Sequence, residues 1–316
     1  MPKEVRINRP YAKAAGVKGF IRVTAFLLVA GLVLVGWVAV SHPGLGVALT
    51  SPEPVGIPAK TGEPSPAADD GDSLFVGQLE QLTQQYTGTY GVYVESLADG
   101  KAFGLRQNEV FPAASLMKLP IMLSVYQAVE QGKAGLDDVY VLQASDQLPG
   151  TTLSTVLPGS SWTYRQLLQF SGQTSDNSAA LILLRLFGRE ALQEAMNSAG
   201  MGQSDFDQDE TTPEDVGAFF SRLYNGSLIS QDHRDELLSF LSQTIFDNWM
   251  PADLPEGVRV AHKVGIEDGA YSDGGIIFGE KPFVLVVMSQ GSDPDEAPKA
   301  TAEIAKMAYG YEEGGS

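Results

Sequence analysis

The sequence predicts an α+β fold in two lobes, with a five-stranded antiparallel sheet flanked by helices and an all-helical lobe inserted into it. Three observations predict this arrangement. Strand patterns occur near both ends of the globular part of the chain, so strands from the two ends can share one sheet. A long series of helical patterns separates them. An uninterrupted apolar run near the N-terminus adds one transmembrane helix ahead of this body.

The composition allows a sizeable core and excludes several kinds of site. Of the 316 residues, 43% are hydrophobic, which is enough to bury the core of a large domain. Cysteine is absent, so disulfides, thiolate metal sites and a lipid-modified cysteine anchor are excluded. The three histidines have no partner at metal-ligand spacing. We therefore expect neither a metal ion nor another cofactor.

The charge is divided unevenly along the chain. Residues 1–22 carry six basic groups and one acidic group, whereas the rest of the chain carries 15 basic and 38 acidic groups. An acidic body repels phosphate backbones, so nucleic acid is not an expected partner. We interpret the acidic surface as a means of solubility and expect the body to be a monomer.

Residues 23–40 predict a membrane anchor. This run contains 18 apolar or small residues, and a helix of that length spans roughly 27 Å, about the thickness of a bilayer core. The basic residues precede it, so the N-terminus is expected in the cytoplasm and the body outside the cell membrane, as in a single-pass protein. A signal peptide cleaved near Ser41 is the alternative and would give a secreted protein. The retained anchor is favoured because the run is longer than a usual signal core.

Residues 41–71 and 72–316 are expected to be a linker and a catalytic body. The linker contains six prolines and few large apolar residues, as in a semi-extended tether. At the start of the body, Asp72 can cap a helix whose apolar residues recur at helical spacing. Two strands follow, Tyr90–Leu97 and Lys101–Leu105, joined by a hairpin signal.

The remaining elements follow in the order helices, strands, helix. A long helix is predicted from about Ser115 to Gln131, and a final helix over about Glu296–Ala308. Further helices are predicted over Tyr164–Ser171, Ser178–Leu186, Glu190–Ser198, Pro213–Tyr224 and Asp232–Leu241. The C-terminal strands are predicted over Val258–Lys263, Gly274–Phe278 and Phe283–Ser289. The active site is expected where the sheet meets the inserted helical lobe.

The first group that carries chemistry is Ser115 with Lys118. Positions i and i+3 share one face of a helix, so the lysine amine can reach the serine hydroxyl. A serine is a weak nucleophile until a base takes its proton, and burial near other cations lowers the pKa of a lysine enough for that task. Backbone N–H groups at the helix start favour a developing oxyanion. A surface serine and lysine on an ordinary helix would give the same pattern.

Two further motifs are ambiguous when taken alone. Ser175-Asp176-Asn177 lies between two predicted helices, where a short polar turn usually means helix capping. Lys263-Val264-Gly265 is predicted at the end of a strand, where glycine lets a ligand approach the backbone closely. An exposed lysine at a strand end would look the same.

In order and spacing the three motifs resemble those of the penicillin-recognising serine hydrolases, in particular the class A β-lactamase-like group. That group has S-x-x-K on a helix, S-D-N on a loop and K-T-G on a strand. The interval of 60 residues from Ser115 to Ser175 fits, and the resemblance covers about residues 72–316. It implies a β-lactamase/transpeptidase-like fold for the body. Shorter matches are Phe111-Pro112-Ala113-Ala114, Thr211-Thr212-Pro213, Ala261-His262 and Ser272-Asp273-Gly274-Gly275, the last expected to open a strand.

The resemblance also implies a role for each side chain of the motifs. Ser115 would attack the carbonyl carbon of the substrate, and Lys118 would accept the serine proton. Ser175, helped by Lys263, would pass a proton to the leaving nitrogen. Asn177 would hold the amide side chain of the substrate and the catalytic lysine.

Backbone groups complete the implied site. The N–H groups of Ser115 and Ile266 would form the oxyanion hole. Gly265 would let the substrate approach the strand. Asp176 is expected to shape its turn rather than to carry a proton.

Two departures from the pattern limit what the resemblance implies. Val264 stands where the group usually has a hydroxyl that binds the substrate carboxylate, a loss of about 1.5–3 kcal/mol. The loop Met201–Glu210 is short and lacks the E-x-x-L-N motif, whose glutamate activates water for deacylation in class A enzymes. Its four acidic residues are possible substitutes, and nothing in the sequence selects one of them. They are Asp205, Asp207, Asp209 and Glu210.

The sequence therefore predicts an exported serine hydrolase that is acylated on Ser115. Its substrate is a β-lactam or a D-Ala-D-Ala-like peptidoglycan stem peptide, since both present an acyl carbon beside a carboxylate. Without the loop glutamate the acyl-enzyme is expected to hydrolyse slowly. The alternative is a non-catalytic, membrane-tethered binding or sensor module on the same fold, which Val264 and the missing glutamate suggest.

Overall fold

The computed structural model describes residues 70–314, which form nearly all of the predicted body. The predicted anchor over residues 23–40, and all but the end of the predicted linker, lie outside these residues. Within the described range, no helix is both long enough and apolar enough to cross a membrane.

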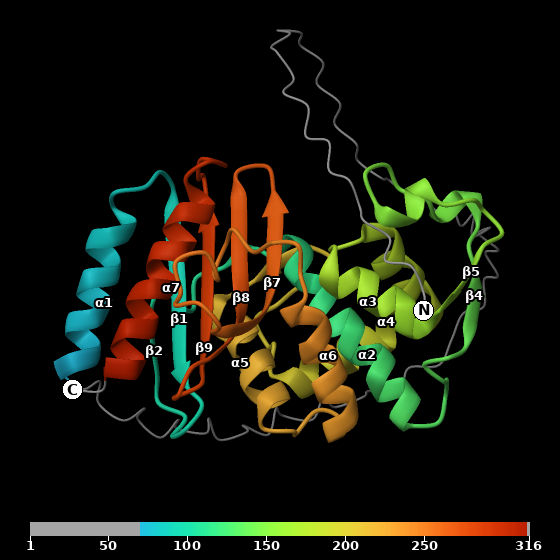
Figure 1. Ribbon diagram of the computed structural model, residues 1–316, viewed down its shortest axis with the longest axis horizontal. Coiled ribbons are helices and arrows are strands. Elements are labelled where there is room, and N and C mark those ends of the chain that lie inside the picture. The colour runs from blue at the N-terminus through green and yellow to red at the C-terminus, as the bar shows by residue number, and fades with distance from the viewer. Residues whose placement is uncertain (1–69, 315–316) are drawn as a thin grey trace, which may run out of the picture. The chain divides into compact units, whose positions relative to one another are not determined.

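The centre of the body is a five-stranded antiparallel sheet with the strand order β2-β1-β9-β8-β7 (Figure 1). Strand β9, from the C-terminal part, pairs with β1 along its whole length. This confirms the predicted α+β fold, in which strands from both ends of the body share one sheet. The strands are β1 (Thr89–Ser96), β2 (Ala102–Leu105), β7 (Arg259–Glu267), β8 (Ala270–Phe278) and β9 (Phe283–Gln290).

Helices cover both faces of the sheet. On one face α1 (Asp70–Thr83) packs against β2, and α7 (Ala297–Gly314) packs against β9. On the other face α5 (Pro213–Tyr224) contacts β1, β8 and β9. A hydrophobic core lies on each face of the sheet, and successive residues of β9 point alternately into the two cores. Val286 lies on the α5 side and Val287 on the α7 side. The strand is therefore buried on both faces, and its sequence reads as a continuous apolar run.

The inserted lobe is all-helical at its centre. It contains α2 (Lys118–Glu130), α3 (Tyr164–Gln173), α4 (Asn177–Ala199) and α6 (Gln231–Ser242). Helix α4 is broken at Gly188, whose φ of 85° and ψ of 166° are not helical. The sequence predicts two helices here, and the break lies between them. Glycine occupies the break because only glycine adopts that conformation without steric cost.

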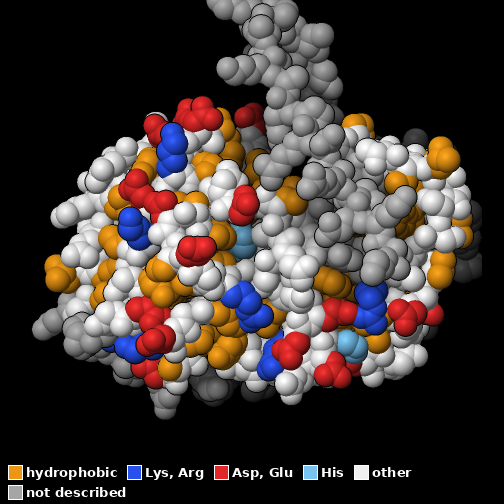
Figure 2. Space-filling view, viewed as in Figure 1, with side chains coloured by type: hydrophobic (Ala, Val, Ile, Leu, Met, Phe, Trp, Pro, Cys, Tyr) orange, Lys and Arg blue, Asp and Glu red, His pale blue; other side chains and the backbone are white. Residues whose placement is uncertain are grey.

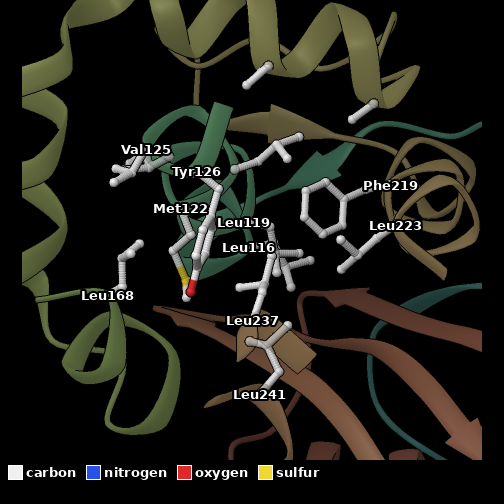
Figure 3. Packing of buried hydrophobic residues seen from close by; sticks show 14 of the residues in the cluster. Leu116, Leu119, Met122, Val125, Tyr126, Leu168, Phe219, Leu223, Leu237 and Leu241 are labelled. Atoms are coloured by element: carbon white, nitrogen blue, oxygen red, sulfur yellow. The ribbon is translucent and has the colours of Figure 1, made fainter. Parts of the chain in front are cut away.

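Helix α2 is the central helix of this lobe and is buried on almost every side. Figure 3 shows Leu116 and Leu119 in one hydrophobic cluster with Phe219 of α5 and Leu237 of α6. A helix that is apolar all round is fixed by its neighbours in both translation and rotation. Lys118 is the first residue of this buried helix, and Ser115 lies in the 3-10 turn that leads into it.

The C-terminal hairpin is longer than the sequence predicts. Strand β7 continues through Lys263 to Glu267, and β8 begins already at Ala270. The two strands are joined by Asp268-Gly269, in which the glycine has a φ of 75°. Ser272-Asp273-Gly274-Gly275 thus lies inside β8 rather than opening it, and Lys263 lies in mid-strand rather than at a strand end. Glycines interrupt the apolar alternation on both strands, and for this reason the predicted strands were too short.

Two pairs of very short strands were not predicted, because two or three residues are too few to show a period. Strand β3 (Phe111–Pro112) pairs with β6 (Glu210–Thr211). Strand β4 (Val139–Val141) pairs with β5 (Ser161–Thr163). The first pair matters for the site, since it ties the segment before Ser115 to the end of the Met201–Glu210 loop.

The prediction that Asp72 caps the first helix is wrong. Helix α1 begins at Asp70, so Asp72 lies inside its first turn. The carboxylate is buried, pairs with Lys101 Nζ at 3.0 Å and accepts a hydrogen bond of 2.6 Å from Tyr311. It therefore joins α1 to the β1–β2 hairpin and to α7.

The acidic excess of the chain is visible on its surface. Figure 2 shows Asp and Glu side chains spread over one face and interspersed with Lys and Arg. Several ion pairs of the described residues are solvent-exposed on both sides, such as Arg106 with Glu80 and Arg189 with Asp207. Exposed pairs contribute at most about 1 kcal/mol each, so the charges favour solubility more than stability.

Candidate active site

The nucleophile candidate Ser115 lies on η1, a 3-10 helix over Ala114–Met117 that leads into α2. The prediction of an α-helix from Ser115 is therefore wrong for this first turn. The preceding residue, Ala114, has a φ of 48°, which costs a non-glycine residue on the order of 1 kcal/mol. Such strained backbone is concentrated at functional sites, where the surrounding packing enforces it.

Lys118 lies at the centre of the polar contacts of the site. Its Nζ lies 2.6 Å from Ser115 Oγ, 2.6 Å from Asn177 Oδ1, 2.9 Å from the Ser175 carbonyl oxygen and 3.0 Å from Ser175 Oγ. The amide oxygen and the carbonyl oxygen only accept hydrogen bonds. A neutral amine has two N–H groups for these two acceptors, which leaves its lone pair available to accept a proton from a neighbouring hydroxyl.

The protonation state of Lys118 follows from its surroundings. The side chain is buried, and burial lowers the pKa of its amine to about 8, although Asp176 and Asp209 act in the opposite direction. At pH 7 roughly one-tenth of the molecules carry the neutral amine, against less than one in a thousand for an ordinary lysine. The neutral form is therefore accessible as a base for Ser115.

The turn between α3 and α4 supplies Ser175 and Asn177. Ser175 has a φ of 53°, and both its carbonyl oxygen and its hydroxyl contact Lys118. Asp176 is buried and caps α4, since its Oδ1 accepts from Ala179 N at 2.9 Å and its Oδ2 accepts from Leu153 N at 3.1 Å. The prediction that Asp176 shapes its turn is confirmed.

Lys263 approaches the same serine from β7. Its Nζ lies 2.8 Å from Ser175 Oγ and 2.8 Å from the Val264 carbonyl oxygen, and 5.8 Å from the centre of the Phe246 ring. Only 1% of the residue is exposed. Burial, and next the charge of Lys118, hold its pKa well below that of an ordinary lysine. Two amines of lowered pKa therefore share one hydroxyl.

These contacts form a continuous chain of proton carriers. It runs from Ser115 Oγ through Lys118 Nζ and Ser175 Oγ to Lys263 Nζ, with no step longer than 3.0 Å. A proton that leaves Ser115 can travel along it toward the place where a leaving group would need one. The structure thus brings together five side chains that the sequence singled out: Ser115, Lys118, Ser175, Asn177 and Lys263.

Gly265 also has a packing role that the sequence did not predict. A methyl group at this position would lie 3.0 Å from the Ala113 carbonyl oxygen and 3.5 Å from the Ala114 side chain. The glycine therefore admits the segment that carries Ser115, and not only a ligand. Next to it Val264 is buried, so the position expected to hold a substrate-binding hydroxyl faces protein. Ile266 is half exposed and lines the pocket beside Ser115.

The imidazole of His262 is not part of this chain. It is buried on β7, and its Nδ1 lies 2.7 Å from Asp273 Oδ1 of β8. The other oxygen of Asp273 accepts a hydrogen bond of 3.0 Å from Met250 N. The contacts of Asp273 with His262 and Met250 therefore join β7, β8 and the loop after α6 behind the site.

The site opens into a pocket of about 450 Å³ between the lobe and β7. Ser115, Lys118 and Asn177 contribute its reactive wall, and most of the remaining lining is apolar. Its apolar side chains are those of Ala114, Met117, Ile121, Leu148, Ala180, Leu181, Phe206 and Ile266. A pocket with few, convergent polar groups is typical of a site for a small organic substrate.

Two carboxylates in this pocket were not selected by the sequence, Asp209 and Glu267. Burial, and next the charge of Glu267, raise the pKa of Asp209 to about 6. Asp209 was one of four candidates in its loop. Glu267 could have been found from the alternation of β7, because it shares a strand face with Lys263 and Gly265.

Comparison with known proteins agrees with this geometry. Residues 75–311 match the model of the beta-lactamase enzyme family.

The chain belongs to this family.

Relatives within the beta-lactamase enzyme family cover most of the chain at low identity. The beta-lactamase VEB-1 of Pseudomonas aeruginosa is 25% identical over 265 residues, which cover 74% of this chain and 89% of that protein. A beta-lactamase of Streptomyces lavendulae is 27% identical over 255 residues, which cover 72% and 83%. Membership of this serine hydrolase family accounts for the contacts that join the three motifs.

Solved structures show the same fold. A beta-lactamase from Sphaerobacter thermophilus is 27% identical and superimposes with a TM-score of 0.69, covering 76% of this chain and 96% of that one. PBP-A superimposes with a TM-score of 0.71 at 23% identity, covering 75% and 95%, which is a likeness of fold. The beta-lactamase-like fold predicted from the motifs is thereby confirmed.

Proposed function

We propose that this protein is a serine hydrolase that is acylated on Ser115 by a β-lactam or by a D-Ala-D-Ala-like peptide of the cell wall, and that it releases the acyl group slowly. The observation that carries the proposal is the contact of 2.6 Å between Lys118 Nζ and Ser115 Oγ. Its two acceptor-only partners leave the lone pair of the amine for the serine proton. The beta-lactamase names of the relatives support the β-lactam as a substrate class.

Acylation follows from the proton chain. Ser115 Oγ attacks the carbonyl carbon as its proton passes to Lys118, and the N–H groups of Ser115 and Ile266 hold the oxyanion. The bond from carbon to nitrogen then breaks, and Ser175 gives its proton to that nitrogen. Lys118 returns a proton to Ser175, while Lys263 holds the hydroxyl in place. No proton is gained or lost overall, and the product is an ester on Ser115.

Slow release is proposed from the loop that follows α4. The loop Met201–Glu210 closes on itself, with Asp205 and Glu210 paired through two backbone hydrogen bonds of 2.8 and 3.0 Å. It has no E-x-x-L-N motif to hold a hydrolytic water. An ester formed easily and hydrolysed slowly is the behaviour of a penicillin-binding enzyme rather than of an efficient resistance enzyme.

We also propose that the body acts outside the cytoplasm, held to the cell membrane by residues 23–40. Support comes from the apolar run of 18 residues and the six basic groups before it. Fractionation of cells that produce the full-length protein tests this proposal. Recovery in the membrane fraction, with the body open to added protease, is expected. A shortened chain in the medium would instead indicate a cleaved signal peptide.

Intact-mass measurement after mixing the full-length protein with benzylpenicillin tests the proposed chemistry. We expect one covalent adduct per chain on Ser115, persisting for many minutes, and none with Ser115→Ala. An adduct that survives this substitution would exclude Ser115 as nucleophile. Absence of an adduct and of drug loss would favour the non-catalytic sensor module that the buried Val264 suggests.

A further inference from the structure

The four acidic residues of the Met201–Glu210 loop have different surroundings. Asp205 accepts hydrogen bonds from the N–H groups of Asp207 and Gln208, so it shapes the loop turn. Asp207 is exposed and pairs with Arg189. The side chain of Glu210 is exposed on β6. Asp209 differs from the others, because it alone among the four lines the pocket that contains Ser115 and Lys118.

The backbone holds Asp209 in register with the nucleophile. Its carbonyl oxygen accepts a hydrogen bond of 2.7 Å from Ala113 N, two residues before Ser115. The neighbouring pair, β3 with β6, extends this connection through Phe111 and Thr211. Asp209 also has a φ of 55°, an uncommon conformation for aspartate that this connection enforces. The backbone of Asp209 is therefore tied to the segment that carries Ser115.

We propose that Asp209 is a catalytic residue, the general base that activates water to hydrolyse the Ser115 ester. This inference rests on the proposed acylation of Ser115 and deepens it, since it identifies the group through which the slow release takes place. The carboxylate has an anionic neighbour, Glu267 at the end of β7, and a cationic one, Lys118. All three lie around the one pocket where an acyl group would be held.

The step balances with these groups alone. A water oxygen bonds to the ester carbon while Asp209 takes one of its protons. The tetrahedral intermediate then collapses, the bond from carbon to Ser115 Oγ breaks, and Lys118 in its ammonium form donates a proton to Oγ across 2.6 Å. The proton on Asp209 restores the ammonium through solvent in the pocket. The acyl group leaves as a carboxylic acid, and no other reactant is needed.

The surroundings of Asp209 set the pH at which it can act. Burial and Glu267 raise its pKa to about 6, while Lys118 and the Ala114 N–H oppose that shift. The base is the ionised form, which increases as the pH rises through 6 and reaches about 90% at pH 7. Release should therefore rise between pH 5 and pH 7. Removal of the Glu267 charge should move this rise to lower pH, because an anionic neighbour no longer opposes ionisation.

The test measures release separately from acylation. Full-length protein is acylated with benzylpenicillin, freed from excess drug, and followed by intact mass from pH 5 to pH 8. The variants are Asp209→Asn, Glu267→Gln and, as a matched control, Glu210→Gln, which removes the same charge from the adjacent, exposed residue. Thermal unfolding confirms that each variant is folded.

We expect Asp209→Asn to be acylated at least as fast as the native protein at neutral pH, because loss of its charge lowers the pKa of Lys118. It should release the acyl group 100-fold or more slowly, without the rise near pH 6. Glu210→Gln should match the native protein, and Glu267→Gln should keep the rise at a lower pH. The proposal is overturned if Asp209→Asn releases at the native rate, or if Glu210→Gln slows release equally. It is also overturned if the native protein shows no rise across this range. Failure to acylate in every variant would refute the proposed function itself.

Discussion

Asp176 is the residue whose replacement tests most directly how the fold positions the site. Its two carboxylate oxygens accept from two different elements, Ala179 N at the start of α4 and Leu153 N in η3, a 3-10 helix over Thr152–Thr155. Both bonds are buried, and only 2% of Asp176 is exposed. Neighbouring Ser175 and Asn177 are the residues that contact Lys118. Loss of the carboxylate should therefore affect stability and chemistry together.

The magnitude follows from counting the bonds lost. Removal of an N-cap acceptor costs about 1 kcal/mol, and a buried N–H left without a partner costs about 1–3 kcal/mol. Asp176→Ala should therefore lower the free energy of unfolding by about 3 kcal/mol. Asp176→Ser keeps the cap on Ala179 and should lose about 1 kcal/mol less. Asp176→Asn keeps one acceptor oxygen but should still be less stable than the native protein, because its NH₂ group must face one of the two N–H donors.

Urea denaturation of the purified full-length protein, followed by tryptophan fluorescence, measures these differences. A second readout is the pH dependence of acylation. Asp176 raises the pKa of Lys118, so its neutralisation should move the acylation profile to lower pH. If Asp176→Asn is as stable as the native protein, the two-acceptor interpretation of this carboxylate is wrong. If the alanine and serine variants are equally stable, the cap on α4 contributes nothing.

Three further predictions concern other buried charges. The rate of acylation by benzylpenicillin should rise as the pH increases through about 8, because the reactive form of Lys118 is the neutral amine; a stopped-flow pH series that is flat from pH 7 to 9 would contradict this. Lys263→Met, measured by the same method, should slow acylation at least tenfold while Ser175 keeps its contact with Lys118. Asp72→Ala should lower the free energy of unfolding by about 2–4 kcal/mol, since Tyr311 loses a buried acceptor; a change below 0.5 kcal/mol in urea denaturation would show that this contact is not needed.

Much of the fold could be predicted because its signals are local or periodic. Pro213 after Thr212 marks the start of α5 at the predicted residue, and the apolar run of β9 is unmistakable. Gly188 separates two helical patterns where the structure has its break. The hairpin of β7 and β8 was shortened in the prediction because Gly265 and Gly274 replace apolar residues. These glycines are required by close packing against other segments, which the local sequence does not show.

The sequence predicted which residues form the site, but not how these residues contact one another. The spacing of Ser115 and Lys118 placed the amine near the hydroxyl, and the structure has them 2.6 Å apart. Both Lys118 and Lys263 contact Ser175, and these contacts depend on its φ of 53°. A serine in the sequence does not predict such a backbone conformation. The distinction between Asp209 and the other loop acids depends on a strand pair of two residues. Tertiary contacts alone decide such features.

The pairing of β1 with β9 has a consequence for how the chain folds. Thr89 and Gln290 are partners across this pair although roughly 200 residues separate them, and closing a loop of that length costs about 5 kcal/mol of chain entropy. Such high contact order makes folding slow. Because β9 lies at the centre of the sheet, the strand that completes the sheet is the last of its five strands to be synthesised. A nascent chain ending before Phe283 would already contain every residue of the proton chain and still have no catalytic site.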